Sequence, residues 1–435
     1  MTRAAMTEAP DIARTKPEAA PDIALASRLF EELRARTAAD EGVTRASYGE
    51  GEQAAHAIVR REAEKLGLEI ATDAAANLYM TMPGAERERA IFIGSHLDSV
   101  PRGGNYDGAA GVFMGLSILS GYRHAGAQPP RDITVMAIRA EESTWFNSSY
   151  IGSRAAFGRL RAEELDGLKR AGDQRTLADC IADCGGDPAA LRRARAHLDP
   201  NRIAAFIEPH IEQAEGLVIR NKPFAVVTGI RGAFRYREAR CLGVYAHSGA
   251  TPRDARRDAV AAVSAFVVEM NAAWRAREAV GEDLAVTFGQ FATDPDEHAF
   301  SKIAGRVDFS LDVRSQSAAT LVAVRNDALA VIERIAREHQ VSFDIGPLTT
   351  TEPALMDQGV IDALKSAAGG SAPLVPCGAG HDAAVFAAIG VPTGMLFIRN
   401  ANGSHNPREH MAMEDFAATA AVLSDACLSG RLAPR

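Results

Sequence analysis

Histidines and carboxylates recur in five short segments of the chain, in patterns that could hold divalent metal ions. The segments cover residues 94–98, 103–108, 141–142, 208–213 and 403–409. None of them contains a cysteine. Imidazole and carboxylate ligands without a thiolate suit Zn²⁺, Mn²⁺ or Co²⁺ as hydrolytic metals. The segments therefore predict a site at which a bound metal ion activates water for hydrolysis.

The spacing within two of these segments predicts distinct roles for neighbouring side chains. Asp98 follows His96 by two residues, so on a strand both would lie on one face and Asp98 could hold the second imidazole nitrogen. In the doublet Glu141-Glu142, one carboxylate could bind a metal while the other accepts a proton from water. Taken singly, such residues often serve turns or solvated strand ends. Their joint occurrence at the ends of buried strands favours a shared site.

The segments that must position these side chains alternate between strand-like and helical patterns. Residues 90–100 and 132–143 are apolar runs that end in polar residues, and residues 107–126 between them have the small and apolar content of a packed helix. Strand–helix–strand order predicts a parallel sheet, whose chemistry lies beyond the carboxyl ends of its strands. We therefore expect an α/β fold with a mixed, mostly parallel sheet flanked by helices.

Residues 229–346 show a different pattern, typical of a smaller inserted domain. Strand-like runs and apolar-striped helices follow the order βαββαβ, which is ferredoxin-like. Over residues 305–314 apolar and polar side chains alternate, which places Arg314 on the polar face of a strand. The predicted organisation is a disordered tail over 1–22, a large catalytic domain formed by 23–228 and 347–430, and the inserted domain over 229–346.

The composition excludes several classes of protein. Of 435 residues, 47% are hydrophobic and 24% charged, so a large core can form. The formal net charge of −8 and the lack of basic runs argue against a nucleic-acid partner. No segment approaches the roughly 18 apolar residues of a membrane span, and residues 1–22 lack the apolar centre of a secretory signal. Five scattered cysteines predict reduced thiols and a cytoplasmic protein.

Two cysteines and six histidines outside these segments could in principle bind metals, but we predict no metal-binding role for them. Cys180 and Cys184 lie one helical turn apart, and we interpret them as thiols rather than as metal ligands. Six histidines stand in polar or helical contexts and are predicted to face solvent. They are His56, His124, His197, His298, His339 and His410.

Seven segments, taken in order between about residues 28 and 425, carry a resemblance to a known family. They are GSHLDSVPRGGNYDGAAGV, AEESTWFNSSYIGSRAAFG, EPHIEQAEGL, TGIRGAFRYR, AHSGATPRDARRDA, CGAGHDAAVFA and GSHNPREHM. The set resembles the amidase/hydantoinase/carbamoylase branch of the zinc-aminopeptidase-like clan. That branch includes N-carbamoyl-L-amino-acid hydrolases, β-ureidopropionases and allantoate amidohydrolases, and is related more distantly to carboxypeptidase G and aminoacylase. The HIEQ and GAGHDA blocks distinguish the branch from the dipeptidases of the clan.

The resemblance implies a dinuclear centre with two divalent metal ions per subunit. Zn²⁺ or Mn²⁺ is expected, and Co²⁺ or Ni²⁺ would also suit the ligands. Asp107 would bridge the two ions, and Glu141 would be the general base. The remaining implied ligands are His96 and His210 for one ion, and Glu142 and His405 for the other.

The resemblance also implies residues that bind a small carboxylate-bearing substrate. Arg314 matches an arginine that holds the substrate carboxylate, and Gln213 and His381 match pocket residues. His247 matches a histidine that reaches the partner subunit's site and polarises the substrate carbonyl, which implies a homodimer with the inserted domain as lid and dimerisation domain. Structural alternatives stay open: a loop histidine at 247, an ion pair between Arg314 and a neighbouring strand, and an internal hydrogen bond between His381 and Asp382.

Two departures from the family pattern concern substrate-facing positions. Trp145 stands where the family has an arginine, and Ser301 where many members have a substrate-contacting asparagine. The expected reaction is hydrolysis of a linear C–N bond, with an N-carbamoyl-L-amino acid or ureido acid as substrate. A peptidase or acyl-amino-acid amidase with a non-standard amide substrate is the alternative. A non-catalytic binding protein that kept the fold is a third hypothesis, which the complete ligand set and Glu141 disfavour.

Overall fold

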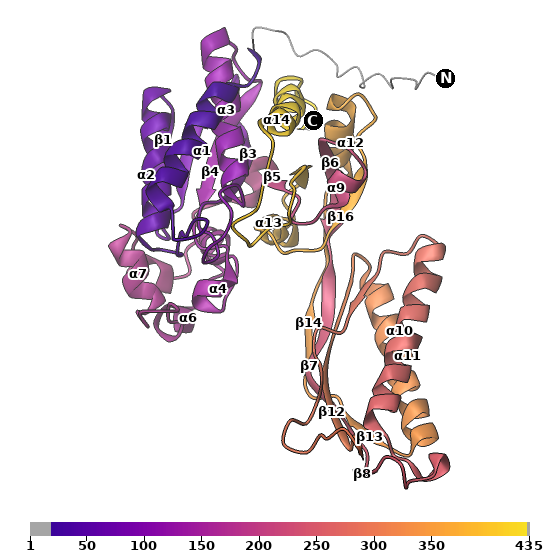
Figure 1. Cartoon of the computed structure of the whole chain (residues 1–435). Helices are drawn as coiled ribbons and strands as arrows, with labels where there is room; N and C mark the ends of the chain where they lie inside the picture. The colour runs from indigo at the N-terminus through magenta and orange to yellow at the C-terminus, as the bar shows by residue number, and fades with distance from the viewer. Residues whose placement is uncertain (1–18, 433–435) are drawn as a thin grey trace, which may run out of the picture. The chain divides into compact units, whose positions relative to one another are not determined.

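The computed structural model describes residues 19–432 and divides into two compact units, each with its own sheet (Figure 1). Within the described residues, the first unit comprises 19–228, Met356–Val375 and 379–432, and the second Gly229–Leu355 and Pro376–Gly378. The second unit continues to Leu355, beyond position 346 where the pattern predicted its end. It continues because β14 (Leu348–Thr351) still pairs with β7 (Gly232–Leu242).

The nine-stranded sheet, which lies mostly in the first unit, is mixed, as predicted, with its parallel pairs at the centre. Its strand order is β1-β2-β4-β3-β5-β17-β6-β15, and β16 pairs with β6. The four strands β4, β3, β5 and β17 are parallel, whereas the outer pairs are antiparallel. β5 is buried along its whole length, as expected of a parallel strand covered on both faces. The strands are β1 (Glu69–Thr72), β2 (Leu78–Met82), β3 (Glu86–His96), β4 (Arg131–Ile138), β5 (Ile203–Ile211), β6 (Phe224–Ile230), β15 (Ala354–Leu355), β16 (Leu374–Cys377) and β17 (Thr393–Ile398).

Helices cover this sheet, and short helices fill the long connection between β4 and β5. α3 packs on β3, β4 and β5, with α1 and α14 against it, while α13 packs on β5 and β17. Phe386 of α13 stacks on Phe206 of β5, with ring centroids 3.7 Å apart. Among the described residues, no helix has both the length and the apolar character needed to cross a membrane. The helices are α1 (Ile23–Thr37), α2 (Glu50–Lys65), α3 (Ala109–Ala125), α4 (Ser143–Phe146), α5 (Ile151–Ala156), α6 (Ala162–Gly167), α7 (Leu177–Asp183), α8 (Pro188–Arg192), α9 (Gly216–Ile219), α12 (Gln358–Ala367), α13 (Ala383–Ile389) and α14 (Met413–Leu428).

The two strands that lead to the polar segments are shorter than predicted. β3 ends at His96 and β4 ends at Ile138, so Asp98 and the Glu141-Glu142 doublet lie in loops. The prediction that Asp98 shares a strand face with His96 is therefore wrong. After β4 the backbone turns at Ala140, whose φ of 53° lies in the left-handed region. This turn leads the chain from the sheet edge into α4.

The end of the predicted disordered tail is ordered. The Asp22 amide donates to the Ser117 carbonyl at 2.9 Å, and the Ser117 hydroxyl donates to the Asp22 carbonyl at 2.7 Å. The Asp22 side chain also caps α1 by accepting from the Leu25 amide at 3.0 Å. The prediction of disorder was wrong for residues 19–22, because these contacts fix them against α3. The rest of the predicted tail, residues 1–18, lies outside the described residues.

The second unit has an antiparallel sheet in the order β10-β12-β7-β13, with two long helices on it. β14 adds to β7, and β9 adds to β12. Buried and half-buried side chains alternate along β12, and Val307, Phe309, Leu311 and Val313 point into the core. The elements not yet given are β8 (Ala246–His247), α10 (Ala259–Ala279), β9 (Ala285–Thr287), β10 (Phe291–Thr293), β11 (Lys302–Ile303), β12 (Arg306–Ser315), α11 (Ala318–His339) and β13 (Ser342–Asp344).

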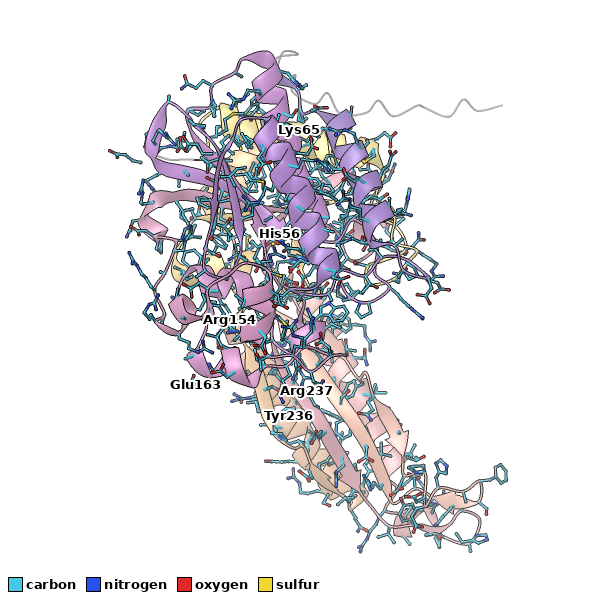
Figure 2. All side chains as sticks on the ribbon, turned by 90° about the vertical axis from the view of Figure 1, so that its left-hand side faces the viewer. His56, Lys65, Arg154, Glu163, Tyr236 and Arg237 are labelled. Atoms are coloured by element: carbon cyan, nitrogen blue, oxygen red, sulfur yellow. The ribbon has the colours of Figure 1, made fainter. Side chains whose placement is uncertain are left out.

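His56 on α2 (Figure 2) contradicts the prediction that it faces solvent. Its side chain is buried, and neither ring nitrogen has a hydrogen-bond partner among the described residues. The helix turns this residue inward because its neighbours Ala55, Ile58 and Val59 form the buried face of α2. Burial, reinforced by the nearby charges of Arg139 and Arg60, holds the pKa of His56 well below its usual range.

We expect this histidine to make the fold less stable in mild acid. Below about pH 6.5 the unfolded chain protonates His56 while the folded chain does not, so the free energy of unfolding falls by up to ~1.4 kcal/mol per pH unit. His56→Leu should therefore flatten the loss of stability between pH 6.5 and 5.5, measured by urea unfolding. His124→Gln, at an exposed position, should keep the wild-type slope. Parallel curves for wild type and His56→Leu would contradict the prediction.

Candidate metal centre

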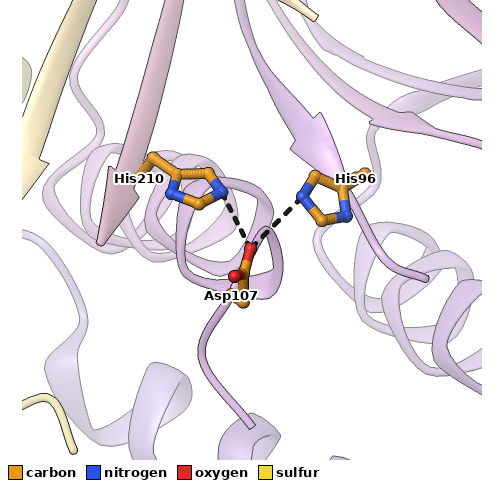
Figure 3. Close-up of side chains that lie close together, drawn as sticks. All are labelled: His96, Asp107 and His210. Carbon is orange, nitrogen blue, oxygen red and sulfur yellow. Dashed lines mark ion pairs between the residues drawn. The ribbon is translucent and has the colours of Figure 1, made fainter. Parts of the chain in front are cut away.

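Three buried side chains from separate parts of the first unit meet at the carboxyl ends of β3 and β5 (Figure 3). His96 is the last residue of β3, His210 lies near the end of β5, and Asp107 precedes α3. The Nε2 atoms of His96 and His210 lie 3.5 Å and 3.1 Å from Asp107 Oδ1. Neighbouring parallel strands bring their carboxyl ends to the same sheet edge, which explains how distant segments converge.

A second group shares the same aspartate. His405 Nε2 lies 3.5 Å from the other oxygen of Asp107, Oδ2, and 3.3 Å from Glu142 Oε1. Glu142 is the residue before α4, and His405 lies in the loop between β17 and α14 with a positive φ of 59°. Unlike the first group, this one is open on one side, because the His405 side chain is 49% exposed.

The two groups fit the ligand sets of divalent cations. In each group the candidate ligand atoms lie within 4.8 Å of one another. Metal–ligand bonds of about 2.1 Å in a tetrahedral site separate ligand atoms by roughly 3.4 Å, close to the distances above. Asp107 Oδ1 is also buried with no hydrogen-bond donor among the described residues, an expensive state for a carboxylate unless a cation binds it. The chemistry of the donors and their spacing therefore suit a metal centre.

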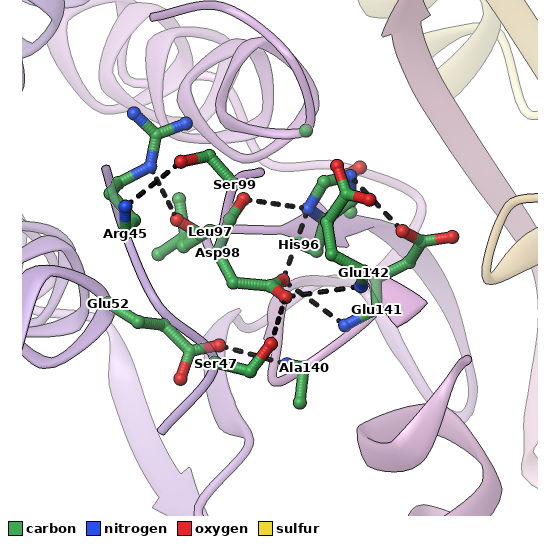
Figure 4. A network of polar contacts seen from close by, with 12 residues as sticks. Arg45, Ser47, Glu52, His96, Leu97, Asp98, Ser99, Ala140, Glu141 and Glu142 are labelled. Atoms are coloured by element: carbon green, nitrogen blue, oxygen red, sulfur yellow. Dashed lines mark hydrogen bonds and ion pairs between the residues drawn. The ribbon is translucent and has the colours of Figure 1, made fainter. Parts of the chain in front are cut away.

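Asp98 orients the first group through the hydrogen bonds in Figure 4. Asp98 Oδ1 lies 3.3 Å from His96 Nδ1, the nitrogen that faces away from Asp107. The carboxylate also accepts from the backbone amides of Glu141 and Glu142, each at 3.1 Å, and from the Ser47 hydroxyl at 2.6 Å. Burial opposes its ionisation, but His96 and these donors together hold the pKa of Asp98 below its usual value. Asp98 thus contacts His96 from a loop rather than from the predicted strand.

Glu141 lies beside the ligands without belonging to either group. Its Oε2 is 3.9 Å from His96 Nε2, and the side chain is buried. Burial raises the pKa of Glu141 well above its usual value; His96 opposes the shift, and the negative charge of Glu142 adds to it. A carboxylate with a raised pKa next to a cation site can take a proton from water and later return it.

Two predicted pocket residues also lie at the centre. Gln213 Nε2 donates to Asp107 Oδ2 at 2.9 Å and lies 3.3 Å from His405 Nε2. His381 is buried with its ring centroid 4.3 Å from that of His210, and its Nε2 has no hydrogen-bond partner among the described residues. Burial lowers the pKa of His381 well below its usual value, which favours the neutral form of the ring. Asp382 accepts a hydrogen bond from Ser153 at 2.5 Å.

The other predicted substrate residues belong to the second unit. His247 on β8 is exposed, and its Nδ1 accepts from the amides of Gly249 and Ala250 at 3.2 Å. The Ser301 carbonyl accepts from the Ser248 amide at 2.9 Å. Arg314 pairs with Asp312 of its own strand at 2.8 Å, whereas the alternative from the sequence was a partner on a neighbouring strand.

Trp145, at the position of the family's arginine, has a structural role in the first unit. Its indole Nε1 donates to the Ser99 carbonyl at 2.8 Å. Ser99 belongs to the loop that follows His96 and Asp98. The bond therefore ties α4, which begins directly after the glutamate doublet, to that loop.

Sequence reasoning missed three residues that support the centre. Arg45 is fully buried; its Nε donates to the Leu97 carbonyl at 2.7 Å and its Nη2 reaches the Asp107 carbonyl at 3.4 Å. Ser404 donates to Asp107 Oδ2 at 2.5 Å, and Glu409 accepts from the Asp107 amide at 3.2 Å. The segment 403–409 was identified by its histidine. The polar side chains of Ser404 and Glu409 in the same segment were the sequence signal that could have indicated their supporting role. Arg45 stands in a polar stretch with no pattern that marks it.

Comparison with known proteins gives consistent matches over most of the chain. Residues 92–429 match the sequence profile of peptidase family M20/M25/M40. The chain is 34% identical over 388 residues to an N-carbamoyl-L-amino acid amidohydrolase from Geobacillus stearothermophilus, with 88% of this chain and 92% of the relative covered. It is 29% identical over 397 residues to an allantoate amidohydrolase from Bacillus subtilis, with 89% and 92% covered.

Solved structures give the same result. An amidase of the hydantoinase/carbamoylase family from Burkholderia multivorans superimposes with a TM-score of 0.85 at 27% identity, covering 96% of this chain and all of that one. A second one, from Burkholderia phymatum, superimposes with a TM-score of 0.80 at 29% identity, covering 94% and 98%. The α/β architecture described above is therefore the architecture of these amidases.

Proposed function

The chain belongs to peptidase family M20/M25/M40, and on that premise we propose that it is a metal-dependent amidohydrolase acting on N-carbamoyl-L-amino acids or ureido acids. The observation that carries the proposal is Asp107, whose two carboxylate oxygens face two separate groups of ligands. The relatives named for N-carbamoyl-L-amino acids and for allantoate support the substrate class. The bond cleaved is a linear C–N bond.

We propose two divalent cations, Zn²⁺ or Mn²⁺, with Co²⁺ and Ni²⁺ as further candidates for these ligands. Asp107 would bind both cations. Bound there, they would lower the pKa of water and polarise the substrate carbonyl. The other proposed ligands are His96 and His210 in the first group, and Glu142 and His405 in the second.

The protein's own residues supply proton transfer and orientation. Glu141 accepts the proton of the attacking water and returns it to the leaving nitrogen, a role that suits its burial and raised pKa. Asp98 holds His96 by Nδ1, so that Nε2 faces Asp107. With a carbamoyl substrate the products are an amino acid, ammonia and carbon dioxide.

Further residues are proposed to bind the substrate. Arg314 is proposed to bind the substrate carboxylate, with Gln213, His381 and Ser301 as further substrate contacts. His247 is proposed to stabilise the oxyanion that forms at the carbonyl, and to act in the site of the partner subunit of a homodimer. Hydrogen bonds aimed at a developing oxyanion are worth about 3–4 kcal/mol in other enzymes.

The proposed function is tested by which product the protein releases, ammonia or an amine. Protein loaded with Mn²⁺ or Zn²⁺ should release ammonia from N-carbamoyl-L-amino acids, and a chelator should abolish the release until metal is restored. If dipeptides or acyl-amino acids release amine while carbamoyl compounds release no ammonia, the protein is a peptidase or acyl-amino-acid amidase instead. Activity in protein without bound metal would overturn the metal-dependent reaction altogether.

The same assay tests the carboxylate-binding arginine. A hydrogen bond to a charged group contributes about 1.5–3 kcal/mol, so Arg314→Met should raise KM roughly 10-fold or more. Arg306→Met is the matched control, because Arg306 lies on the same strand and also pairs with an aspartate two residues along, Asp308. Equal KM values for the two variants would remove Arg314 from substrate binding.

A further inference from the structure

Glu409 is a buried carboxylate that the reaction scheme does not use. It lies in the loop between β17 and α14, and its side chain is 4% exposed. One oxygen, Oε1, accepts from the backbone amides of Tyr106 and Asp107 at 2.9 Å and 3.2 Å. The other, Oε2, lies 2.6 Å from the Ser404 hydroxyl oxygen. All three partners are in or next to the two segments that contain Asp107 and His405.

Ser404 links this carboxylate to the side chain of Asp107. Its hydroxyl lies 2.5 Å from Asp107 Oδ2, the oxygen that faces His405. Glu409 therefore reaches Asp107 by two routes, through the backbone amide and through the Ser404 hydroxyl. The first route fixes where the Asp107 backbone lies, and the second fixes the rotation of its carboxylate.

The loop before Asp107 is shaped to admit Glu409. A Cβ atom at Gly104 would overlap the carboxyl carbon and Oε1 of Glu409, so only glycine permits this approach. The absence of a side chain at residue 104 and the hydrogen bonds that Glu409 accepts from two backbone amides are two separate signs of a built contact.

We propose that Glu409 is a positioning residue that holds Asp107 so that one carboxylate oxygen faces each group of ligands. The proposal rests on the proposed function, because it assumes that cations bind to both groups. Hydrogen-bonding partners of metal ligands typically contribute 10–100-fold in metal affinity. Glu409 acts on the metal through Asp107 and does not bind it.

Binding of Mn²⁺ alone tests this role, measured by calorimetry on metal-free protein. Glu409→Ala removes every contact and should weaken Mn²⁺ binding about 10–100-fold. Glu409→Gln should bind within about threefold of wild type, because the amide oxygen accepts the two backbone amides and the NH₂ group donates to Ser404, leaving the hydroxyl proton for Asp107. Glu414→Ala, at an exposed position in the first turn of α14, is the matched control.

Two further variants test the close approach of Glu409 to Gly104 by changing residue 104. Gly104→Ala should displace Glu409 and weaken Mn²⁺ binding as much as Glu409→Ala does. The double variant should be no weaker than Glu409→Ala, because the methyl group then occupies vacated space. Circular dichroism of the metal-free variants checks that they are folded, and the conservative Glu409→Gln keeps the test decisive should the others fail to fold.

The outcomes separate this proposal from the proposed function. Wild-type protein that binds no Mn²⁺ would contradict the metal centre itself. Wild-type binding together with unchanged affinity in Glu409→Ala would overturn only the role of Glu409. Equal loss in Glu409→Gln and Glu409→Ala would also overturn it, because hydrogen-bonded positioning predicts that the amide substitutes for the carboxylate.

Discussion

Glu141→Gln should bind metal like the wild type and lose about 10²–10⁴-fold in kcat, the usual contribution of a general base. Glutamine keeps the size of the side chain but cannot take a proton from water. The backbone amide of residue 141, which donates to Asp98, is unchanged. Because Glu141 belongs to neither group of ligands, metal content should stay constant. The measurements are kcat for ammonia release and metal per chain by elemental analysis.

Two results would contradict this role for Glu141. A kcat close to that of the wild type would show that another group takes the proton. A large loss of metal would show that Glu141 is a ligand. Glu163→Gln provides the control, because Glu163 is exposed on α6 and its variant should match the wild type in both measurements.

Mixing two inactive variants extends this test to His247. In a homodimer whose His247 acts in the partner's site, a mixed dimer of Glu141→Gln and His247→Ala chains contains one complete site. Random exchange of subunits makes half of the dimers mixed, so about a quarter of wild-type activity should return. If no activity returns although subunit exchange is proven, there are two explanations. Either Glu141 and His247 of one chain act in the same site, or His247 takes no part in the reaction.

Residues with a local pattern could be predicted from the sequence, and those defined by distant contacts could not. His96 ends the apolar run that forms β3, at the strand end where the pattern placed polar residues of a site. Its pairing with His210 was implied by the family resemblance. Along β12 the alternation of apolar and polar residues matched the buried face. Glu409, by contrast, contacts residues some 300 positions away, and no local pattern reports such a contact.

Helical positions failed for a related physical reason. His56 was assigned to solvent although α2 turns it into the core. Which side of a helix is buried depends on the surface against which the helix packs. A polar or aromatic residue at the border of the apolar stripe is therefore buried or exposed according to that surface. In the structure Asp98 lies 3.3 Å from His96, but without the strand geometry from which the contact was predicted.

Asp107→Asn should prevent binding of both cations, a larger loss than any other ligand variant. Within the part of the chain that the structure describes, Asp107 is the one residue common to both groups of candidate ligands. Its carboxylate also faces three imidazoles at 3.1–3.5 Å, and an amide carries no charge to hold cations among them. Metal ions that stabilise the charge of the transition state contribute several kcal/mol. Their loss should therefore lower kcat/KM roughly 10³-fold or more.

The contrast with His405→Ala makes this prediction specific to a shared ligand. His405 belongs only to the second group, so its variant should keep one cation bound by His96, Asp107 and His210. Titration of metal-free protein with Mn²⁺ should therefore give two ions per chain for the wild type, one for His405→Ala and none for Asp107→Asn at concentrations that saturate the wild type. If Asp107→Asn retains one ion, the remaining ligands of one group are sufficient to bind a cation without the aspartate. In that case Asp107 binds a single cation and does not bridge two.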